Sequence, residues 1–367
     1  MDSTRVTQLQ DLMRTEKLDV LALNAGVDLE YFTGLYFHLS ERPAIFLVPS
    51  EGKPAFIFPE FEQEKVKQSC LDLNLYPYPE DTSTWPQIFL NAANSLNLSK
   101  KSIGVAPESF RFLELDLMQT AAGHHRFVSA ASILRSIKIQ KNHEEIMAIR
   151  NAIAIAERAL LAILPKVKTG VSEKWLANQL VIHLLEEGSS PDLPFEPLVA
   201  SGPNSANPHS IPSDRNLQKG DALIIDWGAR FNGYVSDLTR SFIVAGENPL
   251  MDQISQIVLL ANKAATRAAA PNAVASELDN AARDVITNSG YGDAFTHRTG
   301  HGIGLLAHED PYISQSNSLS LKTGMVFTIE PGIYLPGQGG IRIEDNVLIN
   351  DSGCEVLTTL PREVKII

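Results

Sequence analysis

Cysteine is nearly absent from this chain of 367 residues, which has only Cys70 and Cys354. The two lie far apart and form no Cys-x-x-Cys pair, so we expect neither a disulfide framework nor a thiolate metal site. The chain also lacks any run near the ~18 apolar residues of a membrane helix, and its polar start has no apolar signal-peptide core. These absences predict a cytoplasmic protein in a reducing compartment, with no membrane partner.

Basic residues are also few. Lys and Arg number 31 against 43 Asp and Glu, and the formal net charge is −12. Because a nucleic-acid-binding protein presents a basic face, we expect no nucleic-acid partner. Hydrophobic residues make up 44% and charged residues 20% of the chain. This is the composition of an ordinary globular protein, and the length is sufficient for two domains.

The first third of the chain has the pattern of a small α/β unit. Its expected elements are strands at 18–24, 44–48, 55–58 and 103–105 and a helix at 109–122. His124 and His125 follow in a loop, and we interpret them as solvated. A basic strand at 134–140 is expected to lead into the next helix. We place the domain boundary here and define two domains, 1–132 and 133–367.

Four helices are expected in the second domain. Asn142, with Glu145 three residues later, predicts a capping box at the start of a helix that runs to about Leu164. The other three are expected at 172–188, 251–270 and 276–289. Ser276 is the expected cap of the last helix.

The segment from Ala222 to Val244 contains two strand-like runs joined at Asn232-Gly233, a pair typical of a type I′ hairpin turn. Folding about this turn brings Asp226 and Asp237 opposite each other or one diagonal apart, at about 5–8 Å. Two solvated aspartates on an edge hairpin would explain the pair. A shared cation would also explain it, because carboxylates this close repel each other.

Histidines and glycines are concentrated in residues 296–311. His297, His301 and His308 lie among three glycines spaced two residues apart, which argues against a helix and against a helical zinc motif. Glycines beside imidazoles instead indicate backbone that closely approaches a ligand or metal. His209, in a loop rich in Gly, Pro and Asn, is either solvated or presented for function.

Two later strands carry acidic residues in unusual positions. In the strand at 325–336, Glu330 follows an apolar run and precedes Pro-Gly, where plain solvation is unfavourable. The strand at 339–349 alternates strictly and places Arg342 and Glu344 on one face. These two residues form either a structural ion pair or part of a site.

The collected candidates are four carboxylates and one imidazole, with no thiolate: Asp226, Asp237, His301, Glu330 and Glu344. Such an oxygen-rich set suits Mn²⁺, Co²⁺, Fe²⁺ or Mg²⁺ better than structural zinc. Several bridging carboxylates suit two ions about 3.5–4 Å apart, which can share a hydroxide nucleophile.

Five segments resemble the pita-bread metallopeptidases, which include Xaa-Pro dipeptidase (prolidase) and aminopeptidase P. The segments are VASGPNSANPH, GYVSDLTR, HRTGHGIGLLAHE, TIEPGIY and GIRIED. The resemblance covers essentially the whole chain, and residues 1–130 resemble the creatinase-type N-terminal domain. It implies an α+β fold, in which a creatinase-like α/β domain precedes a pita-bread catalytic domain with a curved antiparallel sheet.

The resemblance implies that all five candidates bind metal. Asp237 and Glu344 would bridge two ions, and His301 and Glu330 would hold one of them. Glu330 would also be the general base for the bridging water. Thr239, two residues after Asp237 and on its face, would support the ligands through a hydrogen bond.

The same resemblance implies roles for the other polar residues of these motifs. His209 and His308 would contact the substrate carbonyl or the tetrahedral oxyanion, and His297 would lie beside the scissile bond. Arg342 would orient Asp237 and the substrate, and Tyr334 would help to position the substrate.

The expected function is hydrolysis of the Xaa-Pro bond, with release of the N-terminal residue, by a homodimer that binds two divalent ions. Mn²⁺ is the first expectation, with Co²⁺, Fe²⁺ or Zn²⁺ as alternatives, and residues 195–199 are expected near the proline. The motifs favour prolidase slightly over aminopeptidase P, and the N-terminal domain argues against methionine aminopeptidase. Two alternatives remain: a hydrolase of a small non-peptide amide and a non-catalytic binding protein of the same fold.

Overall fold

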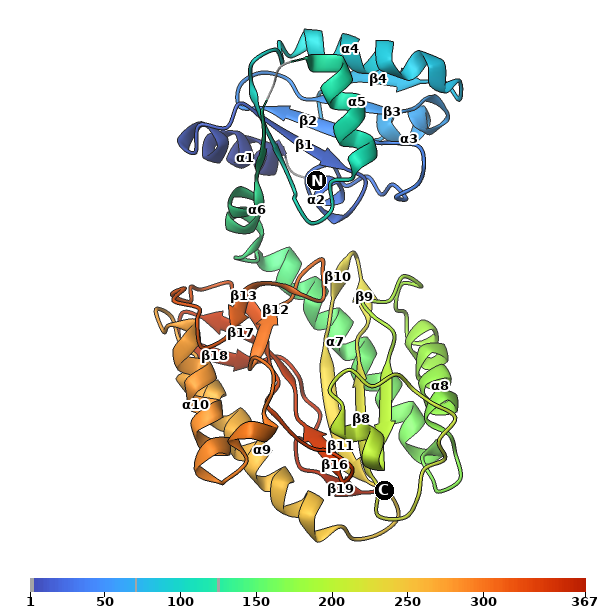
Figure 1. The fold of residues 1–367 in the computed structure, drawn as a ribbon, viewed down its shortest axis with the longest axis vertical. Coiled ribbons are helices and arrows are strands. Elements are labelled where there is room, and N and C mark those ends of the chain that lie inside the picture. Colours follow the sequence, from blue (N-terminus) through green and yellow to red (C-terminus); the bar gives the residue numbers. More distant parts are fainter. Residues whose placement is uncertain (1–2, 70, 124–125) are drawn as a thin grey trace. The chain divides into compact units, whose positions relative to one another are not determined.

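The computed structural model describes residues 3–69, 71–123 and 126–367. The chain divides into two compact units, Met1–Lys138 and Ile139–Ile367 (Figure 1). Cys70 and the predicted loop histidines His124 and His125 lie outside the described residues. No helix in the described ranges is both long and apolar enough to cross a membrane.

The N-terminal unit is a six-stranded mixed sheet covered by helices, with strand order β4-β3-β2-β1-β5-β6. Its strands are β1 Val20–Asn24, β2 Ile45–Pro49, β3 Ala55–Pro59, β4 Asn74–Tyr78, β5 Ser102–Val105 and β6 Arg126–Ser129. Its helices are α1 Ser3–Thr15, α2 Val27–Thr33, α3 Gln63–Lys67, α4 Trp85–Ser95, α5 Phe112–Ala122 and α6 Ala131–Lys138. The four predicted strands and the predicted helix are confirmed as β1, β2, β3, β5 and α5. Every residue of β1, β2 and β3 is buried, which explains why all of them are apolar except Asn24 at the end of β1.

The basic strand predicted at 134–140 is wrong, because residues 131–138 form the helix α6. Ile133 and Leu134 are buried, and Ile137 follows them at helical spacing. The prediction followed the alternation of apolar and basic residues near Ile139 and missed this longer period. Residue Gln140 alone forms a β-bridge, to Met325.

The C-terminal unit contains bent, mainly antiparallel sheets between two pairs of helices (Figure 1). Its helices are α7 His143–Ile163, α8 Glu173–Glu186, α9 Pro249–Ala268 and α10 Ala275–Asn288. Its strands are β7 Leu198–Ser201, β8 Ala222–Trp227, β9 Arg230–Phe231, β10 Tyr234–Val235, β11 Leu238–Ile243, β12 Gly300–Gly302, β13 Glu309–Ile313, β14 Val326–Ile329, β15 Gly332–Leu335, β16 Gly339–Arg342, β17 Asp345–Asn350, β18 Gly353–Val356 and β19 Lys365–Ile366. Among these described strands only β19 pairs in parallel, with β11.

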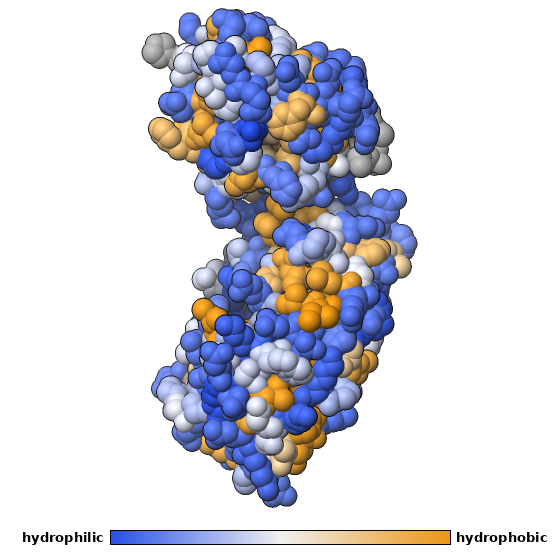
Figure 2. Space-filling model, turned by 90° about the vertical axis from the view of Figure 1, so that its right-hand side faces the viewer, coloured by the Kyte–Doolittle hydropathy of each residue, from blue (hydrophilic) through white to orange (hydrophobic). Residues whose placement is uncertain are grey.

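Each pair of helices covers its own sheet. Helices α7 and α8 pack with the sheet β19-β11-β8-β7, and α9 and α10 pack with the sheet β13-β12-β14-β17-β18 and the hairpin β15-β16. The two layers meet at an isolated bridge between Thr239 and Glu344. This arrangement confirms the α+β prediction of an α/β unit followed by a curved antiparallel catalytic unit. Most of the surface in Figure 2 is hydrophilic, with apolar side chains gathered on the C-terminal unit.

Three elements of this unit differ from their predictions. The stretch 325–336 is two strands of different sheets, β14 and β15, and the stretch 339–349 is likewise divided between β16 and β17. Ser276 does not cap α10, because Val274 occupies the N-cap position and its N–H donates to the Glu277 carboxylate at 3.1 Å. Both interrupted strands break at an acidic residue, Glu330 or Glu344.

The capping box predicted for α7 is confirmed. Asn142 Oδ1 accepts the N–H of Glu145 at 3.0 Å, and Glu145 Oε2 accepts the N–H of Asn142 at 2.7 Å. The box fixes the start of a 21-residue helix whose inner face forms part of the core under β8 and β11. Helix α7 therefore connects the start of the unit to the sheet that carries two of the candidate ligands.

We predict that Asn142→Ala lowers the free energy of unfolding by about 1 kcal/mol, because the N–H of Glu145 loses its side-chain acceptor. Urea unfolding measures this change. Asn142→Asp, which retains an acceptor oxygen, should lose less than half as much. Equal losses in the two variants would contradict the capping role.

Candidate metal centre

The turn that brings the two aspartates together is the predicted one. Asn232 and Gly233 have φ of 49° and 82° and join β9 to β10. In the β8–β11 ladder Asp226 is opposite Thr239, so Asp237 lies one diagonal from Asp226. Gly228 allows the two strands to approach this closely, since a Cβ there would lie 2.1 Å from the Ser236 carbonyl oxygen. The two carboxylates therefore face the same space.

The glycines around His301 bring three strands into close contact. A Cβ at Gly300 would lie 1.9 Å from the Thr328 carbonyl oxygen, and one at Gly302 would lie 2.2 Å from the Asp310 carbonyl oxygen. The N–H of His301 donates to Thr328 Oγ1 at 3.1 Å. The expectation of closely approaching backbone is confirmed, and it places the buried imidazole beside the carboxylates.

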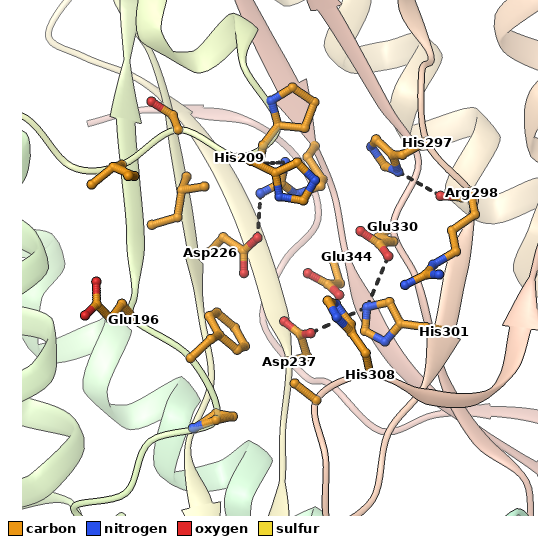
Figure 3. A pocket seen from close by; sticks show the side chains of 18 of the residues that line it. Glu196, His209, Asp226, Asp237, His297, Arg298, His301, His308, Glu330 and Glu344 are labelled. Carbon is orange, nitrogen blue, oxygen red and sulfur yellow. Dashed lines mark hydrogen bonds and ion pairs between the residues drawn. The ribbon is translucent and has the colours of Figure 1, made fainter. Parts of the chain in front are cut away.

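The two interrupted strands supply the other two carboxylates. Beyond the ends of β14 and β16, Glu330 and Glu344 turn toward His301 and Asp237 (Figure 3). His301 Nε2 lies 3.3 Å from Glu330 Oε1 and 3.7 Å from Asp237 Oδ2. The candidate atoms form three groups, in each of which all ligand atoms lie within 4.8 Å of one another: Asp226/Asp237/Glu344, His301/Glu330/Glu344 and Asp237/His301/His308.

The electrostatics of this cluster are unfavourable without a cation. Burial, together with the charges of neighbouring carboxylates, raises the pKa of Asp237 and of Glu344 well above the usual range. Burial also acts on Glu330, but its hydrogen bond to His301 and the imidazole charge outweigh that effect and lower its pKa to about 2. In the described part of the chain, no lysine or arginine forms a salt bridge with these three carboxylates.

The cluster fits divalent ions by the chemistry of its donors. Oδ1 of Asp226 is buried without a hydrogen-bond partner in the structure, which is a costly state for a carboxylate oxygen unless a cation occupies it. The set is rich in carboxylate oxygen and contains one buried imidazole, as expected for Mn²⁺, Co²⁺ or Fe²⁺. Asp237 and Glu344 each belong to two of the three overlapping groups of candidate ligand atoms.

A network of hydrogen bonds orients the candidate ligands Glu344 and Asp226. Thr239 Oγ1 donates to Glu344 Oε2 at 2.7 Å and accepts from Arg342 Nε at 3.0 Å. We expected Arg342 to orient Asp237, but its guanidinium donates to Asp226, Thr239, the Tyr334 hydroxyl and the Pro208 carbonyl oxygen. The predicted support by Thr239 is thus present, directed at Glu344.

Asp237 is positioned by a residue that the sequence analysis missed. The side-chain amide of Asn346 accepts the N–H of Asp237 at 3.2 Å and donates to its carbonyl oxygen. A buried amide aligned with both groups of one peptide fixes the backbone of the ligand without touching its carboxylate. Its only signal in the sequence was its position: Asn346 directly follows the GIRIED segment and lies two residues after Glu344.

A cavity of 680 Å³ opens above the ligands. Its lining includes the expected His209, His297 and His308 and, from the segment 195–199, Phe195 and Leu198. His209 and His308 are exposed to the cavity. The His308 ring lies edge-on to that of His301, with centroids 4.2 Å apart. Burial and the nearby His301 lower the pKa of His308 to about 4, so this side chain is neutral at pH 7.

Both ring nitrogens of His297 are occupied by other parts of the chain. Nδ1 donates to the Arg298 carbonyl oxygen at 2.7 Å, so the Tyr334 hydroxyl, 2.8 Å away, donates to Nε2. That hydroxyl in turn accepts from Arg342 Nη1 at 2.8 Å. Burial lowers the pKa of His297, consistent with a neutral ring. His297 therefore borders the cavity with its ring fixed in place.

Comparison with known proteins agrees with this geometry. The model of metallopeptidase family M24 matches residues 147–351, and the creatinase/prolidase N-terminal domain matches residues 5–139. The Xaa-Pro dipeptidase of Pyrococcus furiosus is 33% identical over 98% of this chain and 99% of its own length. The chain belongs to metallopeptidase family M24.

Solved structures of related proteins extend over the same length. A dipeptidase from Pyrococcus horikoshii has a TM-score of 0.93 and 34% identity and covers 99% of this chain and 100% of its own. An X-Pro aminopeptidase from Thermotoga maritima has a TM-score of 0.86 and 31% identity, with 99% of each chain covered. The protein is therefore a peptidase of this family with the creatinase and pita-bread domains, and its family uses metal ions.

Two charged residues of the cavity of this metallopeptidase had no role assigned from the sequence, although Glu196 lies in the segment 195–199 that was expected near the proline. Glu196 and Arg298 line opposite sides of the cavity (Figure 3), and the Arg298 guanidinium carbon lies 4.3 Å from the centroid of the Tyr312 ring. The only sign in the sequence that Arg298 could belong to the site was its position between His297 and Thr299, within the histidine-rich residues 296–311. Arg298 thus adds a positive charge to the lining of the cavity that contains the candidate ligands.

The raised pKa values lead to a prediction about pH. In the metal-free protein, folding favours the protonated forms of Asp237 and Glu344. Their contribution to stability is therefore complete below their ordinary pKa values of 3.8 and 4.5 and is lost as the pH rises through the higher folded values. A bound cation replaces these protons, so the stabilisation it provides must increase with pH.

We therefore predict that Mn²⁺ raises the unfolding temperature more at pH 8 than at pH 5. Thermal unfolding with EDTA and with saturating Mn²⁺ at both pH values measures the two increments. The control is Asp237→Asn with Glu344→Gln, in which both increments should become small. A larger increment at pH 5 in the unaltered protein would contradict the assigned carboxylates.

Proposed function

We propose that this metallopeptidase is a prolidase, which hydrolyses the Xaa-Pro bond of dipeptides with two divalent ions held by Asp226, Asp237, His301, Glu330 and Glu344. The observation that carries the proposal is the complete cluster of ligands beneath the cavity. The names of the relatives, Xaa-Pro dipeptidase and X-Pro aminopeptidase, support the choice of bond. Mn²⁺ as the metal and a homodimer as the assembly remain predictions.

The surrounding residues suit the hydrolysis of an amide. When bound, the two ions supply an activated water and polarise the scissile carbonyl group. Glu330, ionised because of its low pKa, accepts the proton of the attacking water and delivers it to the leaving proline nitrogen. Neutral His308 and exposed His209 donate hydrogen bonds to the oxygen on which charge develops. His297, whose ring is held by the Tyr334 hydroxyl, lies beside the scissile bond.

The contrast between a metal ligand and a substrate-binding histidine gives a direct prediction. Asp237→Ala should lower turnover by about 10³-fold or more and reduce the bound metal, because a bridging ligand is lost. His308→Ala should retain both ions and lower kcat by about 10²–10³-fold, as expected for loss of one oxyanion donor. Metal analysis and steady-state kinetics on the same preparations distinguish the two. Full metal content in Asp237→Ala, or metal loss in His308→Ala, would contradict these roles.

The preference for dipeptides rests on Arg298. A dipeptide ends in a carboxylate directly after the proline, whereas a longer peptide continues with an amide. Among the described residues of the cavity there are two arginines. Arg342 already pairs with Asp226, which leaves Arg298 as the guanidinium available to a substrate carboxylate.

We predict that Arg298→Ala raises KM for a Xaa-Pro dipeptide by roughly tenfold or more, the value of one charged hydrogen bond. The same substitution should change KM less than twofold for the dipeptide amide, which has no terminal charge. Arg298→Lys is the matched variant and should restore part of the difference. An equal effect on both substrates would remove the case for carboxylate recognition.

The function itself is tested with metal-stripped protein resupplied with Mn²⁺, Co²⁺ or Zn²⁺. Cleavage of a Xaa-Pro dipeptide and not of a Xaa-Pro-Xaa tripeptide is the expected result. Efficient cleavage of the tripeptide would show aminopeptidase P activity instead. Two bound ions without cleavage of either peptide would favour a hydrolase of small non-peptide amides, and failure to bind metal would favour a non-catalytic protein.

A further inference from the structure

Glu173 is a fully buried carboxylate outside the chemistry described so far. It is the first residue of α8, where a negative charge is favourable. Its Oε1 accepts the N–H and the hydroxyl of Ser201, both at 2.7 Å. Its Oε2 accepts the N–H of Ser213 at 3.1 Å and the hydroxyl at 2.6 Å. One carboxylate thus joins the two ends of the segment 201–213.

The same carboxylate also holds the interior of that segment. The side-chain amide of Asn204 contacts Glu173 Oε1 at 3.1 Å and Oε2 at 3.0 Å, and it contacts Ser213 Oγ at 3.2 Å. Arg215 continues the network through Ser201 Oγ, at 2.6 Å, to Asp221. All of these contacts lie at the base of the segment, away from the cavity.

The tip of the segment carries His209. This residue is exposed, lines the cavity, and has its N–H bonded to Asn207 Oδ1 at 3.1 Å. Fixing both ends of a loop reduces the conformations open to its middle. Because a displacement of about 1 Å in a reacting group can cost 10²-fold in rate, the base of this loop matters for the reaction at its tip.

We infer that Glu173 is a positioning residue, which acts on the reaction only by holding the 201–213 segment so that His209 faces the metal centre. The inference rests on the proposed function for its kinetic consequence. Loss of the carboxylate leaves the donors of buried Ser201 and half-buried Ser213 without their acceptor, so the segment must rearrange to satisfy them.

A double-mutant cycle between Glu173 and His209 tests this inference. Glu173→Gln keeps the shape of the side chain but replaces one acceptor oxygen with a donor NH₂. It should lower kcat on a Xaa-Pro dipeptide by about tenfold to a hundredfold, with two metal ions still bound. In a His209→Ala background the same change should lower kcat less than twofold, because the group that it positions is already absent.

Glu157→Gln is the matched control. Glu157 is also buried, and it accepts hydrogen bonds from the N–H and hydroxyl of Thr359 and the N–H of Leu360, which do not line the cavity. It should lower the unfolding temperature as Glu173→Gln does and leave kcat within twofold of normal. An equal loss of kcat for Glu173→Gln with and without His209 would show a purely structural role and overturn the inference.

Hydrogen exchange gives a readout that does not depend on activity. The amides of residues 202–212 should exchange at least about tenfold faster in Glu173→Gln, and not in Glu157→Gln. If Glu173→Gln does not fold, Ser213→Ala removes one hydroxyl from the carboxylate and should show the same changes at smaller size. Unchanged exchange in 202–212 would overturn the inference. Absence of Xaa-Pro cleavage by the unaltered protein would refute the proposed function and leave this measurement valid.

Discussion

The repulsion among four carboxylates confined to one buried site is the constraint on which the rest of this structure depends. Asp226 and Asp237 come from a single bent pair of strands, and Glu330 and Glu344 from two more. In a low dielectric such a group is stable only when protons or cations neutralise it. The raised pKa values of Asp237 and Glu344 mean that, without metal, these carboxylates tend to bind protons, which removes part of the repulsion. A pair of divalent ions is the other means of neutralising the site and the one that permits chemistry.

The backbone is shaped to create this site. Strands β14 and β16 end shortly before the inward-pointing Glu330 and Glu344, and glycines replace side chains where strands approach too closely for a Cβ. The residue between Glu344 and Asn346 illustrates the support. Asp345 is fully buried and pairs with Arg240 at 2.9 Å and with Arg362 at 2.7 Å. Ion pairs on one side of the strand thereby hold the metal ligands on the other side in place.

The sequence predicted the features of this fold that depend on local backbone preferences. The Asn232-Gly233 turn, the capping box of α7 and the exclusion of a helix around His301 all follow from backbone conformations available to those residues. The breaks at Glu330 and Glu344 were not predicted. Glu344 lies in uninterrupted β-type sequence, and at Glu330 the following Pro331-Gly332 was a signal that the prediction of one continuous strand passed over. The role of Asn346 and the target of Arg342 were missed because their partners are distant in the chain.

Family membership and site geometry together explain why one scaffold can act on different peptides. The candidate metal ligands and their supporting hydrogen bonds lie in and beside the bent sheets, whereas Glu196, His209 and Arg298 line the cavity from loops. The Xaa-Pro dipeptidase and X-Pro aminopeptidase relatives match nearly the whole chain. We therefore locate the choice between them in the loops around Glu196, His209 and Arg298.

The central claim is that the cluster binds two ions that share bridging carboxylates. Anomalous diffraction from Mn²⁺-soaked crystals at the manganese edge measures this directly. The account predicts two peaks about 3.5–4 Å apart, with Asp237 and Glu344 contacting both. A single peak, or none within reach of His301, would contradict it.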